Sequence, residues 1–193
     1  MTTVRCSIPQ APQHTGVEVE VDFTYWQWLF PLAVTLHNLE EAIWLPAWSR
    51  SAGRWQRVVY PGAFRFAVAV LTLLAYLVAW WSVEAGPESV GTYLLTGFAV
   101  AMLLNVAVPH LIASLALRRY MPGLGTALLL NLPVTVCLLV SAVDGGYVHF
   151  PLVAYTGAGV TVVLLASIPP LLAIGQNLSR RISPSAAQAD PLP

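Results

Sequence analysis

The chain has 193 residues, of which 57% are hydrophobic and only 9% charged, and its formal net charge is zero. Soluble domains carry about 25% charged residues, so this composition excludes an ordinary soluble domain and predicts a polytopic membrane protein. A neutral chain offers no basic surface to nucleic acid, so we expect no nucleic-acid partner. The nine basic residues are all arginine, which indicates a GC-rich bacterial genome and predicts a protein of the bacterial inner membrane.

The first 22 residues lack the apolar core of a signal peptide, and we expect an extramembrane arm there. Five later segments approach or exceed the ~20 residues that a helix needs to cross a bilayer. They comprise residues 23–48, 66–85, 92–117, 125–143 and 151–176. The sequence therefore predicts an all-α fold, with a five-helix transmembrane domain over 23–176 and a disordered cytoplasmic tail over 177–193.

The arginines predict the orientation of these helices. Eight of the nine lie in the segments that follow the first, third and fifth helices, which share one side if the helices alternate in direction. Loops rich in arginine face the cytoplasm. We therefore expect the N-terminus outside and the C-terminus in the cytoplasm.

The first predicted helix carries three ionisable side chains near its middle, in the stretch HNLEE of residues 37–41. The spacings of three and four bring Glu40 and Glu41 within reach of His37. Each ionised group at the centre of a membrane helix costs roughly 2.5–3.5 kcal/mol on insertion scales. A proton, a metal, a basic partner or water must therefore stabilise them, and such groups usually mark a functional site.

Polar residues in two later helices are expected at a similar depth. Asn105 and His110 lie in the third predicted helix, where Pro109 should weaken the helix and bend it. Asn131 lies in the fourth. An asparagine in a membrane helix often makes only an interhelical hydrogen bond. Two interpretations of Asn131 are therefore possible: a structural hydrogen bond between helices, or a role in substrate binding.

The segment His37-Asn38-Leu39-Glu40-Glu41 resembles the signature of the HXXEE-motif family, small bacterial integral membrane proteins of uncharacterised function. The resemblance extends over about residues 24–176, and Asn105 with His110 are similar to the Asn and His that accompany the signature. The resemblance implies a membrane enzyme without an assigned reaction, and it supplies no substrate.

One chemistry that fits these residues is metal-dependent hydrolysis. His37, Glu41 and His110 form a set of two histidines and one carboxylate, which leaves positions open on a divalent zinc or iron ion. The second glutamate, Glu40 if Glu41 binds the metal, is then available as a general base, and Asn105 as a residue that orients a ligand. The sequence leaves open which of Glu40 and Glu41 takes which role. A buried site of this kind predicts a lipophilic small-molecule substrate that enters laterally from the membrane lipid or from the cytoplasmic half.

Two other chemistries remain open from the sequence. Without a metal, a protonated glutamate and a histidine would serve as acid and base in an isomerase or cyclase that acts on a lipid or terpenoid. A buried cluster of His and Glu also occurs in proton-coupled transporters, and a membrane scaffold with a polar lock is a further alternative.

Overall fold

Helices account for almost all of the described chain, which comprises residues 23–52 and 58–182 of this computed structural model. No strand occurs within those two ranges. The helices form five rods, with the bounds α1 (Phe23–Ser49), α2 (Pro61–Ala85), α3–η2–α4 (Val90–Asn105, Val106–Leu111, Ile112–Leu117), α5–η3–α6 (Leu124–Thr126, Ala127–Asn131, Leu132–Asp144) and α7 (Phe150–Ile182). The predicted all-α fold is therefore confirmed.

Four of the five rods are long and apolar enough to cross a membrane, with the bounds Pro61–Ala85, Val90–Leu117, Leu124–Asp144 and Phe150–Arg181. The first rod, α1, is not among them. Its 27 residues are long enough to span, but the polar stretch of residues 37–41 lowers its mean hydropathy. The chain thus has the helices of a membrane protein, and the helix with the ionisable cluster is the least apolar of them.

Two helix ends differ from the sequence-based bounds. α2 begins at Pro61 rather than at residue 66, because proline suits the first turn of a helix and Tyr60 before it is extended. α7 reaches Ile182, so residues 177–182 are helical rather than part of a tail. Arg180 and Arg181 lie in its last turn, where cations favour the helix dipole. The expected arm over 1–22 and the rest of the tail lie outside the described residues.

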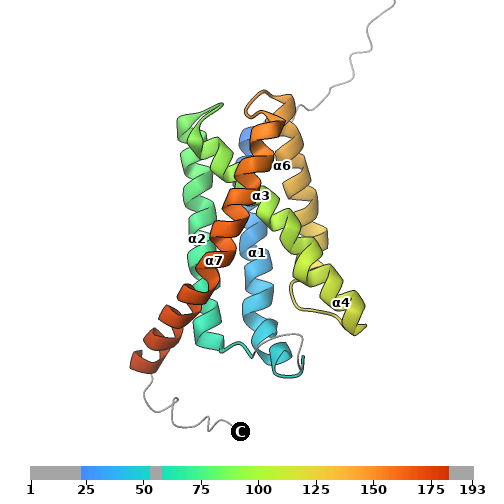
Figure 1. Ribbon diagram of the computed structural model, residues 1–193, viewed down its shortest axis with the longest axis vertical. Helices are drawn as coiled ribbons and strands as arrows, with labels where there is room; N and C mark the ends of the chain where they lie inside the picture. Colours follow the sequence, from blue (N-terminus) through green and yellow to red (C-terminus); the bar gives the residue numbers. More distant parts are fainter. Residues whose placement is uncertain (1–22, 53–57, 183–193) are drawn as a thin grey trace, which may run out of the picture.

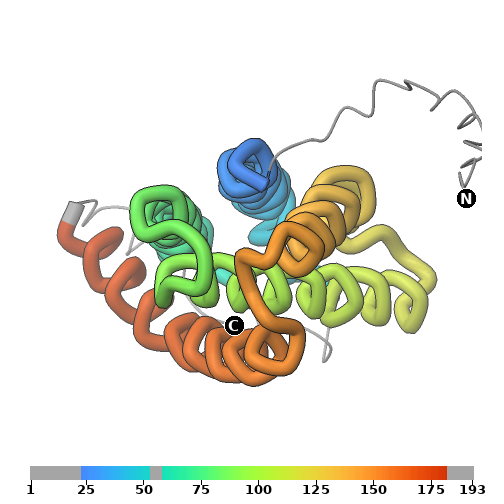
Figure 2. Tube along the Cα trace, turned by 90° about the horizontal axis from the view of Figure 1, so that it is seen from above, coloured from blue at the N-terminus to red at the C-terminus, as the bar shows by residue number. Residues whose placement is uncertain are grey.

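The rods are arranged around α3, which runs through the middle of the bundle (Figures 1 and 2). α2, α6 and α7 pack against α3, while α1 packs against α2 and α6. Figure 1 shows that the end of α1, the start of α2 and the ends of α4 and α7 lie at the same end of the bundle. These ends carry the described arginines, as the alternation of helices required; Arg54 and Arg57 lie outside the described residues.

The apolar core fills the half of the bundle that is remote from those arginines. Phe30 of α1 and Phe98 of α3 are buried there with their rings edge to face, at a centroid distance of 5.7 Å. Leu95 and Leu138 belong to the same cluster of buried side chains. This packing fixes α1, α3 and α6 relative to one another, and the polar residues of these helices meet between the core and the arginine end.

Candidate functional site

Three ionisable side chains from two separate rods meet in the structure: His37 and Glu41 of α1, and His110 of η2. The Nε2 atom of His110 lies 3.2 Å from Oε1 of Glu41, and Nε2 of His37 lies 3.9 Å from the same oxygen. One ligand atom from each of the three residues falls within 4.8 Å of the others. The structure thus brings together the two histidines and one carboxylate that the sequence analysis grouped as metal ligands.

The cluster is deeply buried. His37 is 1% exposed and His110 is 0% exposed, and their rings meet edge to face at a centroid distance of 4.9 Å. Neither ring nitrogen of His110 makes a hydrogen bond with the described residues. The contact of Nε2 with Glu41 is close in distance but lacks the direction of a hydrogen bond. A buried polar atom without a partner costs about 1–3 kcal/mol, and a bound cation would remove that cost.

A kink in the third rod points His110 into the cluster. Val108 has φ −130° and ψ 118°, outside the helical region, and the Val108–Pro109 peptide bond is cis. The residue before a proline avoids the helical region, and proline has no N–H to continue the helix. The bend expected at Pro109 is therefore present, and it lies within η2, directly before His110.

A chain of hydrogen bonds holds the ring of His37. Its Nε2 lies 3.1 Å from Nδ2 of Asn105, and its Nδ1 lies 3.2 Å from Oγ1 of Thr126. The Thr126 hydroxyl donates to Oε2 of Glu40 at 2.6 Å, so its oxygen accepts from Nδ1–H of His37. The lone pair of His37 then lies on Nε2, where it accepts from the Asn105 amide, and the same nitrogen lies 3.9 Å from Oε1 of Glu41.

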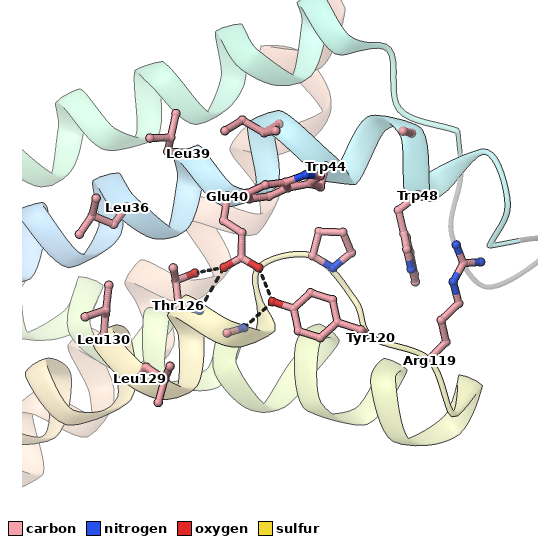
Figure 3. A pocket seen from close by; sticks show the side chains of 14 residues that line it. Leu36, Leu39, Glu40, Trp44, Trp48, Arg119, Tyr120, Thr126, Leu129 and Leu130 are labelled. Carbon is pink, nitrogen blue, oxygen red and sulfur yellow. Dashed lines mark hydrogen bonds between the residues drawn. The ribbon is translucent and has the colours of Figure 1, made fainter.

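The two neighbouring glutamates serve different parts of the structure. Glu41 is 13% exposed and faces the histidines, whereas Glu40 binds the segment that leads from α4 into α5 (Figure 3). Its carboxylate accepts hydrogen bonds from the backbone N–H of Gly123 at 2.9 Å and of Thr126 at 3.0 Å, and from the hydroxyls of Thr126 and Tyr120. The loop engages both carboxylate oxygens of Glu40, and Glu40 does not belong to the cluster of His37, Glu41 and His110.

Gly123 allows the loop backbone to lie directly against the cluster. Its φ of +96° favours glycine, and a Cβ atom there would come within 2.5 Å of Cε1 of His110 and 3.0 Å of Cγ of Glu41. Gly125 makes a similar close approach on the other side of the loop, where a Cβ would lie 2.8 Å from the Tyr120 hydroxyl. The segment from Gly123 to Thr126 therefore forms a thin wall beside the cluster.

Sequence reasoning missed Tyr120, Gly123 and Thr126. The segment YMPGLGT had only the marks of a turn, and no sequence pattern shows that a loop will fold onto a helix about 80 residues earlier. The Tyr120 hydroxyl donates to Glu40 and accepts from the backbone N–H of Gly125 at 2.9 Å. Partial desolvation of the hydroxyl, and next its hydrogen bond to Glu40, raises the pKa of Tyr120 above its ordinary value of 10.0.

Asn131 is 1% exposed, at the end of η3. Neither atom of its side-chain amide makes a hydrogen bond with the described residues, and the same is true of the buried Thr135 hydroxyl one turn later. Thr126, five residues before Asn131, makes the contact with His37 instead. The structure therefore shows Asn131 as a buried polar residue, and its role in substrate binding stays a prediction.

An apolar groove of about 970 Å³ lies beside the wall, whose residues Gly125 and Thr126 line it. Figure 3 shows Glu40 and Thr126 at its side. α1 forms one side of it, and the loop after α4 together with η3 forms the other. Leu39 is 53% exposed and Leu129 is 77% exposed, so the groove opens to the outside of the bundle. Glu40 and Thr126 both line it, and the groove therefore shares two residues with the hydrogen-bond chain that holds His37.

Comparison with known proteins gives two matches. The family described as "Protein of unknown function with HXXEE motif" matches residues 28–138, which include the cluster and the wall. The chain is also 37% identical over 155 residues to "Uncharacterized protein YrkK" of Bacillus subtilis (strain 168), an alignment that covers 80% of this chain and 98% of that protein. No solved structure matches the chain.

Proposed function

Since the chain belongs to the HXXEE-motif family, we propose that the motif and His110 form the metal site of a membrane-embedded hydrolase that acts on a lipophilic small molecule. One observation carries the proposal: two imidazole nitrogens and a carboxylate oxygen from α1 and η2 converge within 4.8 Å. Two histidines and one carboxylate suit zinc or non-haem iron and leave positions open for water or substrate.

Each residue of the cluster has a separate role in the proposed metal site. His37 and His110 present Nε2, and Glu41 presents Oε1, to one point between them. In the structure the Asn105 amide donates to the same nitrogen of His37. A bound ion would take the place of that hydrogen bond and leave the amide beside it, where it can orient a ligand of the ion. A divalent ion held here would supply Lewis acidity and lower the pKa of a bound water toward ~7.

We assign Glu40 a positioning role in place of the general base expected from the sequence. Its carboxylate is engaged by the loop and reaches His37 only through the Thr126 hydroxyl. Groups that hold the second nitrogen of a metal-binding histidine fix its tautomer and raise its basicity, and their loss typically costs 10–100-fold in metal affinity. In this proposal Glu40 and Thr126 act through His37.

We also propose that α1 crosses the membrane with the other four rods, the N-terminus outside and the C-terminus in the cytoplasm of a bacterial cell. The burial of His37 and the low exposure of Glu41 support this arrangement, because the most polar side chains of α1 face the bundle. Buried ionisable groups of membrane helices usually face the interior in this way. The arginines at one end of the bundle then face the cytoplasm.

The close contact of His110 with Glu41 favours a second candidate function. A buried imidazole 3.2 Å from a carboxylate is also within reach for proton transfer, as a metal-free isomerase or cyclase would require. The two functions make opposite predictions about metal content, so one measurement separates them.

The test is elemental analysis of the full chain purified from membranes without chelator. We expect about one zinc or iron ion per chain in the wild type, and a loss of at least tenfold in His110→Ala. His149→Ala is the matched control, because His149 lies 3.4 Å from Glu88 in an exposed pair. A wild-type protein that folds and binds no metal would contradict the hydrolase and favour the isomerase or cyclase.

A further inference from the structure

The groove beside the cluster has two unlike ends. Figure 3 places Arg119 and Trp48 at one end, and Leu36 and Leu130 at the other. Its volume of about 970 Å³ lies at the upper end of the roughly 300–1,000 Å³ typical of small-molecule sites. Such a shape suits a ligand with a polar head and an apolar tail.

The charges that line the groove differ in how they are satisfied. The carboxylate that lines the groove is Glu40, and it already accepts four hydrogen bonds from the loop. The cation that lines the groove is Arg119. It has no carboxylate within salt-bridge distance among the described residues, and its guanidinium donates no hydrogen bond to them. The charge in the groove without a protein partner among those residues is therefore positive.

Trp48 holds the guanidinium at the end of the groove. The Cζ atom of Arg119 lies 5.8 Å from the centroid of the Trp48 ring, within the range of a cation–π contact. The N–H donors of the guanidinium have no hydrogen-bond acceptor among the described residues. Such donors recognise carboxylate and phosphate oxygens in the plane of the guanidinium.

We infer that the groove binds an anionic amphiphile, with its carboxylate or phosphate head on Arg119 and its tail along Leu36, Leu39 and Leu129. This inference rests on the proposed function in that the amphiphile is taken as the lipophilic substrate. The tail runs along side chains that are 41%, 53% and 77% exposed, so it enters from the open side of the groove.

Thr126 connects the groove to the cluster. It lines the groove, and its hydroxyl lies 3.2 Å from Nδ1 of His37. Gly123, at the start of the same wall, approaches His110 so closely that no side chain fits between them. An amphiphile in the groove is therefore separated from the cluster by the thickness of one loop.

The experiment uses two photoreactive probes that differ only in charge: a fatty acid with a diazirine in its chain, and the methyl ester of that acid. The full chain in phosphatidylcholine nanodiscs is irradiated with each probe, and mass spectrometry locates the label. We expect the acid to label the segments around Leu39 and Leu129 saturably, and the ester to label them no more than it labels Leu165, which is 61% exposed on α7.

Arg119→Gln should reduce labelling of the groove by the acid at least tenfold, because the carboxylate loses its charge-assisted hydrogen bond to the guanidinium. Arg118→Gln is the matched control, since Arg118 is adjacent but does not line the groove. Leu129→Trp, which fills the groove without touching the charge, should reduce labelling as well. Competition by oleate would identify a free acid as the occupant, and competition by phosphatidylglycerol in the nanodisc would identify a bilayer lipid.

Equal labelling by acid and ester would overturn the inference, as would an Arg119→Gln variant labelled like the wild type. A groove covered by a second copy of the chain would take up neither probe, which also contradicts it. Failure of the proposed function gives a different result: a protein without metal whose groove is still labelled by the acid alone. Metal content unchanged in Arg119→Gln, together with lost labelling, would show that the two sites are separate.

Discussion

Two pairs of histidine and glutamate have almost the same spacing, one inside the bundle and one on its surface. His110 and Glu41 are 3.2 Å apart, and His149 and Glu88 are 3.4 Å apart. The first pair is 0% and 13% exposed, and the second is 67% and 61% exposed. Distance does not distinguish them, so their difference lies in burial and in what surrounds each pair.

Water solvates the exposed pair, and such surface pairs contribute only about 0–1 kcal/mol. The buried pair has no such solvation, and a third ionisable group, His37, faces it. A buried charge needs a partner that satisfies it, and an unpaired one is strongly unfavourable. Burial and the third group therefore explain why a histidine and a glutamate form an ordinary surface contact at His149 and Glu88 but a candidate metal site at His110 and Glu41.

The largest effect is expected at Gly123, with Gly146 as its counterpart near the exposed pair. Gly123→Ala places a Cβ where it meets His110 and also strains a backbone at φ +96°, so we expect a loss of about 3–5 kcal/mol in stability together with the bound metal. Gly146→Ala has a similar backbone at φ +70° but no atom within 4 Å, and should cost only about 1–2 kcal/mol. Thermal unfolding and metal content measure both, and equal losses would show that backbone strain alone matters.

The hydrogen-bond chain predicts a smaller effect. Thr126→Val removes the hydroxyl between Glu40 and His37 and should weaken metal binding 10–100-fold, while Thr126→Ser should restore it. Thr135→Val is the matched control, because its buried hydroxyl has no partner and an apolar group of the same shape is nearly neutral there. Metal titration of the three variants measures this loss of affinity. A wild-type affinity in Thr126→Val would show that Thr126 does not position His37 for metal binding.

The smallest effect concerns Tyr120. Tyr120→Phe removes one of the four hydrogen bonds to Glu40 and should cost about 1 kcal/mol or less, because the residue is exposed. Since the folded protein raises the pKa of Tyr120, the stabilisation is complete below pH 10 and is lost as the pH rises through the raised value. Unfolding measured from pH 7 upward should show the variant and the wild type converging only above pH 10. A constant difference at all pH values would contradict this assignment.

The sequence was informative where chemistry follows from residue type. Ionisable groups in an apolar helix indicated the cluster, and Pro109 indicated the bend that orients His110. The roles of the two glutamates could not be separated, because both lie within reach of His37 on an isolated helix. Their difference arises from a loop far along the chain, whose glycines permit an approach that only the folded structure reveals.

Asn131 shows the opposite limit of sequence reasoning. Its position in the fourth predicted helix gave it a place near the histidines, and it is indeed buried. The chain enters that rod through a turn of α5 and the π-helical segment η3, so Thr126 rather than Asn131 contacts His37. Counting residues along an ideal helix does not account for such a segment.

X-ray absorption spectroscopy of the zinc-loaded full chain reports the atoms around the metal and therefore decides whether His37, Glu41 and His110 hold it. We expect two imidazole ligands and carboxylate oxygen in the wild type, one imidazole in His110→Ala, and an unchanged spectrum in His149→Ala. Zinc surrounded by oxygen alone, or a spectrum that His110→Ala leaves unchanged, would contradict a site built from His37, Glu41 and His110.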